Sequence, residues 1–155
     1  MRILFVCTGN TCRSPLAEGL ARRVIHERAW PDVEVSSAGT SAWPNAPASD
    51  GSMLVALEHG IDLGGHRARQ LSPELVAKSD IILTMGPHHL ERAEALGGVG
   101  RTWLLTAFAN AERARPVSDP FGGDLATYRA TFDELEDEIT AVLDRIAAER
   151  ARRSA

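Results

Sequence analysis

Two cysteines, an arginine and a serine lie together near the N-terminus, where residues 7–14 read CTGNTCRS. Cys7 precedes Arg13 by six positions, and Pro15 follows the stretch. The backbone N–H groups of a tight loop can point inward at an anion, and an arginine guanidinium clamps oxyanions through two N–H groups. The spacing predicts a phosphate-binding loop with contacts from Thr8, Gly9, Asn10, Thr11, Cys12, Arg13 and Ser14.

Cys7 is the predicted nucleophile of this loop. The thiolate is the reactive form of cysteine, and an adjacent arginine together with a helix N-terminus favours it. Gly9 lets the backbone turn closely around an anion. The alternative interpretation is a buried cysteine at a strand end and a surface arginine whose spacing arose by chance. A Walker-type phosphate loop is excluded because its glycine and Lys-Ser/Thr positions are missing.

Asp119-Pro120 is the candidate partner of Cys7. Phosphoryl transfer to a thiolate needs an acid for the leaving group and later a base for the attacking water, and one carboxylate can serve as both. Pro120 restrains Asp119, and the loop around them follows a predicted strand, on the side of the sheet where ligands bind. The alternative is an ordinary turn, because aspartate and proline are common in turns.

The elements that must position these residues begin with a strand, a loop and a helix. Ile3-Leu4-Phe5-Val6 is a continuous apolar run, typical of a buried parallel strand. Ser14 is the predicted N-cap of the following helix and Pro15 its first residue, and the apolar repeat continues to about Arg28. Cys7 is therefore expected where a buried strand approaches a helix N-terminus.

Strands and helices alternate along the rest of the chain. We predict strands at 33–35, 80–85 and 102–105, a turn at 36–39, helices at 53–60 and 87–96, and loops at 40–50 and 110–124. A long amphipathic C-terminal helix is indicated by apolar residues three or four apart, namely Tyr128, Phe132, Leu135, Ile139, Val142 and Ile146. This order predicts a single-domain three-layer α/β sandwich over residues 1–155, with a central four-stranded parallel sheet and helices on both faces.

The composition bounds the partners of the protein. A chain of 155 residues with 44% hydrophobic content has the size of one domain that can bury its own core. The net charge of −4 gives no reason to expect a nucleic acid or an anionic membrane as partner. Ligand spacing with carboxylates is missing around the five histidines, so we expect no metal; they are His26, His59, His66, His88 and His89. His88-His89 is interpreted as a solvated helix start.

The two cysteines are too few for a secreted disulfide framework and fit a reducing compartment. The apolar run at residues 3–7 is shorter than the core of a signal peptide, and no other stretch is long enough to span a bilayer. We therefore expect a cytoplasmic protein. We also expect it to be a monomer or a weak dimer.

The stretch from Val6 to Pro15, together with Asp119-Pro120, resembles the two signature motifs of the low-molecular-weight protein tyrosine phosphatase family. Residues 36–40, residues 66–70 and the strand ending at Met85 also resemble segments of the family, in the same order. The resemblance extends over nearly the whole chain. It implies the α/β sandwich already predicted and a phosphorylated protein as substrate, with no cofactor.

The resemblance also implies a role for each residue of the motifs. Cys7 is expected to be the nucleophile, and Arg13 to bind the phosphoryl oxygens. Asp119 is expected to act first as general acid and then as general base. Ser14 is expected to steady the thiolate.

Two further expectations concern the support and the oxidation of the loop. In the family, an asparagine holds the loop in a strained shape and bonds to a histidine, and Asn10 and His66 match these positions. From the residues alone, His66 is a capped surface histidine. In related enzymes the cysteine beside the nucleophile forms a reversible disulfide, which for Cys12 and Cys7 would prevent overoxidation. The alternative is that Cys12 is a small buried filler.

Thr11 is the informative position for the substrate. Many tyrosine-specific relatives carry a larger apolar residue such as isoleucine there, whereas protein arginine phosphatases of the family carry threonine. A threonine hydroxyl can accept from a phosphoarginine N–H group that isoleucine would leave unpaired. Phe121 is followed by two glycines instead of a second aromatic residue, which points the same way, and its ring can stack on a guanidinium plane.

These features predict a protein phosphatase that acts through a phosphocysteine intermediate, with phosphoarginine as favoured substrate and phosphotyrosine as alternative. In the alternative, Thr11 is a neutral variant of a tyrosine phosphatase. Arsenate reductases that share this fold relay a disulfide through further cysteines, which this chain lacks. A phospho-binding module without turnover should have lost Cys7 or Asp119, and both are present.

Overall fold

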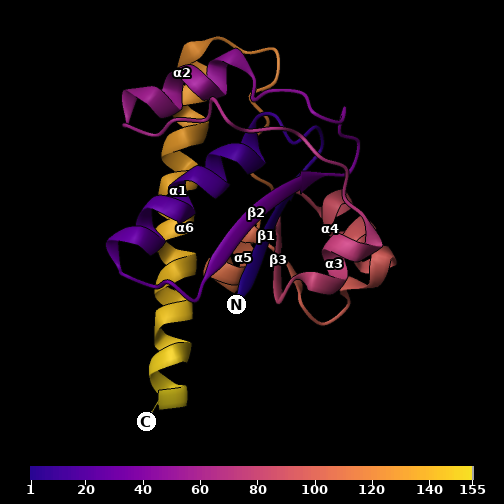
Figure 1. The fold of residues 1–155 in the computed structure, drawn as a ribbon, viewed down its shortest axis with the longest axis vertical. Coiled ribbons are helices and arrows are strands. Elements are labelled where there is room, and N and C mark those ends of the chain that lie inside the picture. The colour runs from indigo at the N-terminus through magenta and orange to yellow at the C-terminus, as the bar shows by residue number, and fades with distance from the viewer. Residues whose placement is uncertain (155) are drawn as a thin grey trace.

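Four parallel strands form the centre of the molecule (Figure 1). The computed structural model describes residues 1–154. The strand order is β2-β1-β3-β4, and the strands are β1 (Arg2–Cys7), β2 (Glu34–Gly39), β3 (Ile81–Thr84) and β4 (Thr102–Leu104). Every residue of β1 beyond the first is buried, as expected for a continuous apolar run with a strand on each side.

The register of the strands brings their carboxyl ends to one edge of the sheet. Cys7 pairs with Gly39, and Val6 pairs with Thr84. Because the strands are parallel, the segments that follow β1, β2 and β3 all leave the sheet at this edge. The chain crosses from β1 to β2 through α1 (Arg13–Glu27), which begins directly after the loop that leaves β1.

One face of the sheet is covered by α1 and three further helices. These are α2 (Asp50–Glu58), α5 (Leu105–Ala109) and α6 (Leu125–Ser154). The long α6 runs beside α1 (Figure 1) and also contacts α2 and α5. The larger core cluster lies between these helices and the strand side chains of Ile3, Phe5 and Leu83.

The opposite face is covered by α3 (Pro73–Lys78), α4 (Pro87–Ala93) and η1 (Glu94–Gly98). Strand residues that alternate with the first set point this way, and Leu4, Val6 and Ile82 pack against Val76 and Ala93. The sheet therefore has helices on both faces. The predicted three-layer α/β sandwich with a central four-stranded parallel sheet is confirmed.

The amphipathic C-terminal helix is confirmed as well. All six apolar residues that predict it are buried in the larger core cluster. Phe132 is fully buried, and its ring stacks on that of His59 with the centroids 4.0 Å apart. One buried stripe along a 30-residue helix is what an amphipathic repeat of this length predicts.

The segment 36–39 is strand and not the predicted turn. Ser37, Ala38 and Gly39 are buried in β2 and pair with β1. The small residues suggested a turn because serine and glycine are frequent in turns. In the structure the loop that leaves β1 packs directly against Gly39, because a Cβ added there would overlap the carbonyl oxygen of Thr8.

The prediction that Ser14 is the N-cap of α1 is wrong. The helix begins at Arg13, its N-cap is Cys12, and no side chain caps it. The Ser14 hydroxyl is instead within hydrogen-bond distance of the Cys7 thiol and the Asn10 amide, so it belongs to the loop. A serine followed by a proline is typical of a helix start, and the sequence does not show that the serine hydroxyl bonds elsewhere.

The short helices α3 and α5 have no counterpart in the prediction. They are six and five residues long, which gives little periodic signal. The predicted loop at 110–124 is confirmed apart from the single turn η2 (Ala111–Arg113). Among the helices of residues 1–154, none is long and apolar enough to cross a membrane.

We predict that Gly39→Ala destabilises the protein by about 1–3 kcal/mol in the free energy of unfolding, measured with a chemical denaturant. The added Cβ would overlap the carbonyl oxygen of Thr8 and lie 2.9 Å from the nitrogen of Asn10. Both are backbone atoms, so the whole loop must shift. Gly65→Ala is the control, because a Cβ there meets no atom within 4 Å. Equal stability of the two variants would contradict the prediction.

Candidate active site

A cavity of about 210 Å³ lies at the carboxyl end of β1, between the loop that leaves this strand and the loop that carries Asp119. Its lining residues are Cys7, Thr8, Gly9, Thr11, Cys12, Arg13, Asp119 and Phe121. Most of the predicted site residues therefore meet at one place. Asn10 and Ser14 are fully buried behind the lining.

Cys7 is the last residue of β1, and its side chain is at the cavity although the residue is only 2% exposed. Its Sγ lies 2.9 Å from the Oγ of Ser14, in the first turn of α1. A hydroxyl at this distance can donate to a thiolate. The contact between Cys7 and Ser14 is therefore present in the structure, and the roles of the two residues stay predictions.

Asn10 holds the loop in its shape. Its φ of 57° lies in the left-handed region that residues other than glycine rarely adopt. The side-chain Nδ2 donates to the hydroxyls of Ser14 and Ser37 at 2.8 and 2.9 Å, and Oδ1 accepts from the backbone N–H of Arg69 at 2.9 Å. Three hydrogen bonds to a fully buried side chain offset the backbone strain.

His66 supports the same residue from the outside of the loop. Its Nε2 donates to the backbone carbonyl oxygen of Asn10 at 2.7 Å. A carbonyl only accepts, so Nε2 carries the hydrogen. The expected bond between these two residues is present, and it uses the main chain of Asn10 because its side chain is occupied elsewhere.

Arg13 connects the phosphate-binding loop with the loop of Asp119. Its guanidinium is buried, with Nη1 donating to the carbonyl of Val117 at 3.0 Å and Nη2 lying 3.5 Å from Oδ2 of Asp119. The other carboxylate oxygen of Asp119 accepts from the N–H of Phe121 at 3.0 Å. Asp119 therefore makes the turn of the alternative interpretation and also lines the cavity.

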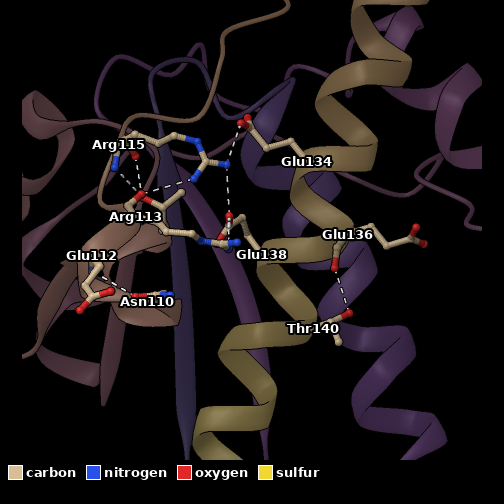
Figure 2. Close-up of polar contacts among 9 residues, drawn as sticks. Asn110, Glu112, Arg113, Arg115, Glu134, Glu136, Glu138 and Thr140 are labelled. Atoms are coloured by element: carbon tan, nitrogen blue, oxygen red, sulfur yellow. Dashed lines mark hydrogen bonds and ion pairs between the residues drawn. The ribbon is translucent and has the colours of Figure 1, made fainter.

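Ion pairs on α6 anchor the loop that carries Asp119 (Figure 2). Glu138 is only 2% exposed at its side chain, and its Oε1 accepts from Arg113 and Arg115 at 3.0 and 3.1 Å. Glu134, one turn earlier, accepts from Arg115 at 3.1 Å and from the N–H of Ser118 at 3.2 Å. The residue next to Asp119 is thus tied to α6.

Further hydrogen bonds fix the same loop to the end of β3 and to α5. The N–H of Val117 donates to the carbonyl of Met85, directly after β3, at 2.8 Å. The hydroxyl of Thr106 donates to the carbonyl of Arg115 at 2.6 Å and accepts from its N–H at 2.9 Å. Asp119 is therefore carried by a loop that is held from two sides.

Thr11 and Phe121 both line the cavity. Phe121 is 79% exposed, so its ring is free for contact with a bound molecule.

Cys12 is buried, with its Sγ 3.3 Å from the Ser49 hydroxyl and 3.5 Å from the Tyr128 hydroxyl. Burial raises the pKa of Tyr128; a hydrogen bond from Ser49 opposes this and the Cys12 thiol adds to it. Both cysteines are free thiols, and the Cys7–Cys12 disulfide remains a prediction.

His89 is a residue of the site that sequence reasoning missed. The prediction of a solvated helix start holds for His88, which is exposed, and is wrong for His89, which is fully buried in α4. Its Nε2 lies 2.8 Å from the hydroxyl oxygen of Thr8, in the cavity wall. Helical spacing held a signal, because His89 and the buried Ala93 are four residues apart and share a face.

The pKa of His89 is lowered to about 3, mainly by burial, with His88 and Arg13 lowering it further and Asp119 raising it. The ring is therefore neutral near pH 7. Within residues 1–154, no three His, Cys, Asp or Glu side chains come together in a way that could hold a metal ion.

The parallel sheet and the cysteine-arginine loop at the end of its first strand define a cysteine-dependent phosphatase. The sequence profile described as low molecular weight phosphotyrosine protein phosphatase matches residues 2–152, and the chain belongs to this family. The resemblance inferred from the motifs is thereby confirmed.

Two curated relatives and one solved structure illustrate the similarity. The chain is 37% identical to a protein-arginine-phosphatase of Geobacillus stearothermophilus, over 96% of this chain and 98% of that protein. It is 38% identical to the low molecular weight protein-tyrosine-phosphatase PtpB of Staphylococcus haemolyticus, over 87% of this chain and 92% of that protein. A YwlE arginine phosphatase, the C7S mutant with a phosphorylated active-site serine, superposes with a TM-score of 0.90 at 35% identity, covering 97% of this chain and 99% of that chain.

We predict that Glu138→Gln lowers the free energy of unfolding by about 1–3 kcal/mol, because two arginines lose a charged acceptor. It should also lower kcat by roughly several-fold, because the loop that carries Asp119 loses its anchor and the carboxylate is displaced from its position in the cavity. Thermal unfolding and turnover of p-nitrophenyl phosphate measure the two effects. Asp137→Asn makes the same chemical change at an exposed neighbour and should alter neither. Unchanged turnover in Glu138→Gln would show that the ion pairs do not position the loop.

Proposed function

We propose that this protein hydrolyses phosphorylated protein side chains through a phosphocysteine intermediate on Cys7. The observation that carries the proposal is that the Cys7 thiol, the Arg13 guanidinium and the Asp119 carboxylate line one small cavity. The relative with a serine at the active site that became phosphorylated supports a covalent intermediate at this position.

In the first step the Cys7 thiolate attacks the phosphorus atom and the bond from phosphorus to the leaving group breaks. Arg13 and the N–H groups of the loop bind the phosphoryl oxygens and stabilise the charge that develops on them. Asp119, in its protonated form, gives its proton to the leaving nitrogen or oxygen. Ser14 donates to the sulfur before the attack, which keeps the nucleophile charged.

In the second step water attacks the phosphocysteine. Asp119 is now a carboxylate and takes a proton from that water, the sulfur–phosphorus bond breaks, and inorganic phosphate leaves. The sulfur returns as a thiolate, again beside the hydroxyl of Ser14. Asp119 ends protonated, as it was before the first step, so the cycle closes.

We propose protein phosphoarginine as the favoured substrate. Thr11 lies in the cavity wall, where its hydroxyl can accept a hydrogen bond from the guanidinium next to the scissile phosphorus–nitrogen bond. Phe121 presents an exposed ring at the same cavity, on which a planar guanidinium can stack. The similarity to the protein-arginine-phosphatase of G. stearothermophilus supports this choice.

Phosphotyrosine is the second candidate substrate. The similarity to the protein-tyrosine-phosphatase PtpB of S. haemolyticus supports it, at an identity close to that of the arginine phosphatase. The exposed ring of Phe121 at the cavity can also contact a phenyl ring. We further propose a cytoplasmic location, on the ground that two free cysteines without a disulfide framework fit a reducing compartment.

We predict that Cys7→Ser abolishes turnover and that Asp119→Asn, with p-nitrophenyl phosphate as a substrate whose leaving group needs no acid, slows the second step more than the first, so that phosphocysteine accumulates. The serine hydroxyl is a far weaker nucleophile than a thiolate, and the amide cannot take a proton from water. Mass spectrometry of the quenched enzyme detects the phosphorylated residue, and steady-state kinetics measures turnover. For poor leaving groups, Asp119→Asn should be slower than the natural protein by about 10²–10⁴-fold.

Asp124→Asn is the matched control, because it changes a carboxylate in the same segment that lies outside the cavity and bonds to Thr127 instead. It should turn over like the natural protein. Turnover by Cys7→Ser at the natural rate would rule out the covalent mechanism. Phosphorylation found on another residue would do the same.

We predict that Thr11→Ile lowers kcat/KM for a phosphoarginine peptide by roughly tenfold to a hundredfold, because a guanidinium N–H loses its acceptor. The same substitution should leave turnover of a phosphotyrosine peptide unchanged or raise it. The two peptides have the same sequence around the modified residue, and Cys7→Ser serves as the blank. Thr11→Ser, which keeps the hydroxyl, should retain the preference for phosphoarginine. A preference for phosphotyrosine in the natural protein would reverse the assignment of the substrate.

A further inference from the structure

His89 carries a polar atom that the fold leaves without a partner. The residue is fully buried, and its Nδ1 has no hydrogen-bond partner among residues 1–154. Its single hydrogen bond joins Nε2 to the hydroxyl oxygen of Thr8 at 2.8 Å. An apolar side chain of similar shape would avoid the unpaired atom, so packing alone does not explain a histidine here.

The contact with Thr8 reaches into the cavity. Thr8 follows Cys7 directly in the chain and lies in the cavity wall with Arg13. The charged groups that face His89 are Arg13 and Asp119 from the cavity side, with His88 from its own helix. The imidazole therefore lies behind the wall of the site and contacts it through one hydroxyl.

The unpaired nitrogen indicates where the ring hydrogen lies. A neutral imidazole has one N–H donor and one acceptor nitrogen. With the hydrogen on Nδ1, a buried donor would be unsatisfied and the Thr8 hydroxyl would be used up as donor to Nε2. With the hydrogen on Nε2, the ring donates to Thr8 and only an acceptor is left unpaired, which native structures tolerate more readily than a buried unpaired donor.

We propose that His89 is a positioning residue for the oxyanion site, which donates from Nε2 to the oxygen of Thr8 and leaves the Thr8 hydroxyl hydrogen free to bind a phosphoryl oxygen. Thr8 then adds a side-chain donor to the backbone N–H groups and Arg13. Without a donor at Nε2 of His89, the Thr8 hydroxyl could direct its hydrogen either to that nitrogen or to the phosphoryl oxygen. The bond from His89 removes that choice before the anion arrives.

The contact also completes the support of the loop. His66 holds it from one segment through the carbonyl of Asn10, and His89 holds it from α4 through the side chain of Thr8. The two histidines contact Asn10 and Thr8, the residues on either side of Gly9. Both histidines contact the loop through Nε2, and of the two contacts that of His89 faces the cavity.

The inference rests on the proposed function insofar as the oxyanion is a transferred phosphoryl group. The test therefore measures oxyanion binding separately from turnover. The probe is inorganic vanadate, whose inhibition constant is determined alongside kcat and KM for p-nitrophenyl phosphate. The variants are His89→Leu, Thr8→Val and the double substitution, with the exposed His88→Leu as control.

We expect His89→Leu and Thr8→Val each to raise the vanadate inhibition constant by roughly tenfold, since a hydrogen bond to a charged group of that strength is lost. The double variant should be no worse than either single one, because both remove the same interaction. His89→Gln, whose amide N–H can take the place of Nε2–H, should stay within about threefold of the natural protein. His88→Leu should bind vanadate as the natural protein does.

Several outcomes would overturn the inference. Additive effects would show that His89 does not act through Thr8, and a lower melting temperature with an unchanged inhibition constant would show that its role is only structural. If His89→Leu does not fold, nitrogen NMR of the natural protein decides, since the inference requires a protonated Nε2 and a bare Nδ1 at pH 7. A natural protein that binds vanadate but turns over no phosphorylated substrate would refute the proposed function and leave this inference standing.

Discussion

The backbone of Asn10 is the constraint on which the rest of the structure depends. Its left-handed conformation lets the loop after β1 turn around a small cavity, and an L-residue adopts it only where the surroundings enforce it. The enforcing groups come from distant parts of the chain: the Ser37 hydroxyl from β2, the backbone of Arg69, and the ring of His66. The fold therefore brings these segments to one edge of the sheet, and the loop in turn brings Cys7 and Arg13 together.

This constraint explains the composition of β2. An edge strand usually carries β-branched or aromatic side chains, yet residues 36–39 are serine, serine, alanine and glycine. The loop backbone approaches Gly39 so closely that no Cβ fits without displacing Thr8 or Asn10. These residues have low intrinsic strand propensity and instead allow contact with the loop of the site. Because they are also frequent in turns, the sequence pattern indicated a turn.

Much of the fold was open to prediction because it rests on periodicity. The apolar run of β1 and the stripe from Tyr128 to Ile146 carry strong signals, and the cysteine-arginine spacing carries the chemistry. Features that failed depend on contacts between distant segments. The sequence indicates a helix cap at Ser14, but in the structure its hydroxyl contacts the Cys7 thiol and the Asn10 amide. It indicates a solvated His89, but α4 packs that residue against the loop. No local pattern encodes such contacts, although the spacing to Ala93 did mark the buried face.

Arg13 has to serve two loops, and the geometry shows how it can. Its bond to the carbonyl of Val117 has an ordinary length of 3.0 Å, whereas its distance to Asp119 is 3.5 Å, longer than the roughly 2.7–2.9 Å of a strong charge-assisted bond. The guanidinium is therefore fixed by a neutral acceptor and only loosely paired with the carboxylate. A bound oxyanion can replace Asp119 as the partner of Nη2 while the bond from Nη1 to Val117 holds the guanidinium in place. In the proposed mechanism this exchange frees the Asp119 carboxylate from Arg13, while the ion pairs of Glu138 keep its loop in place.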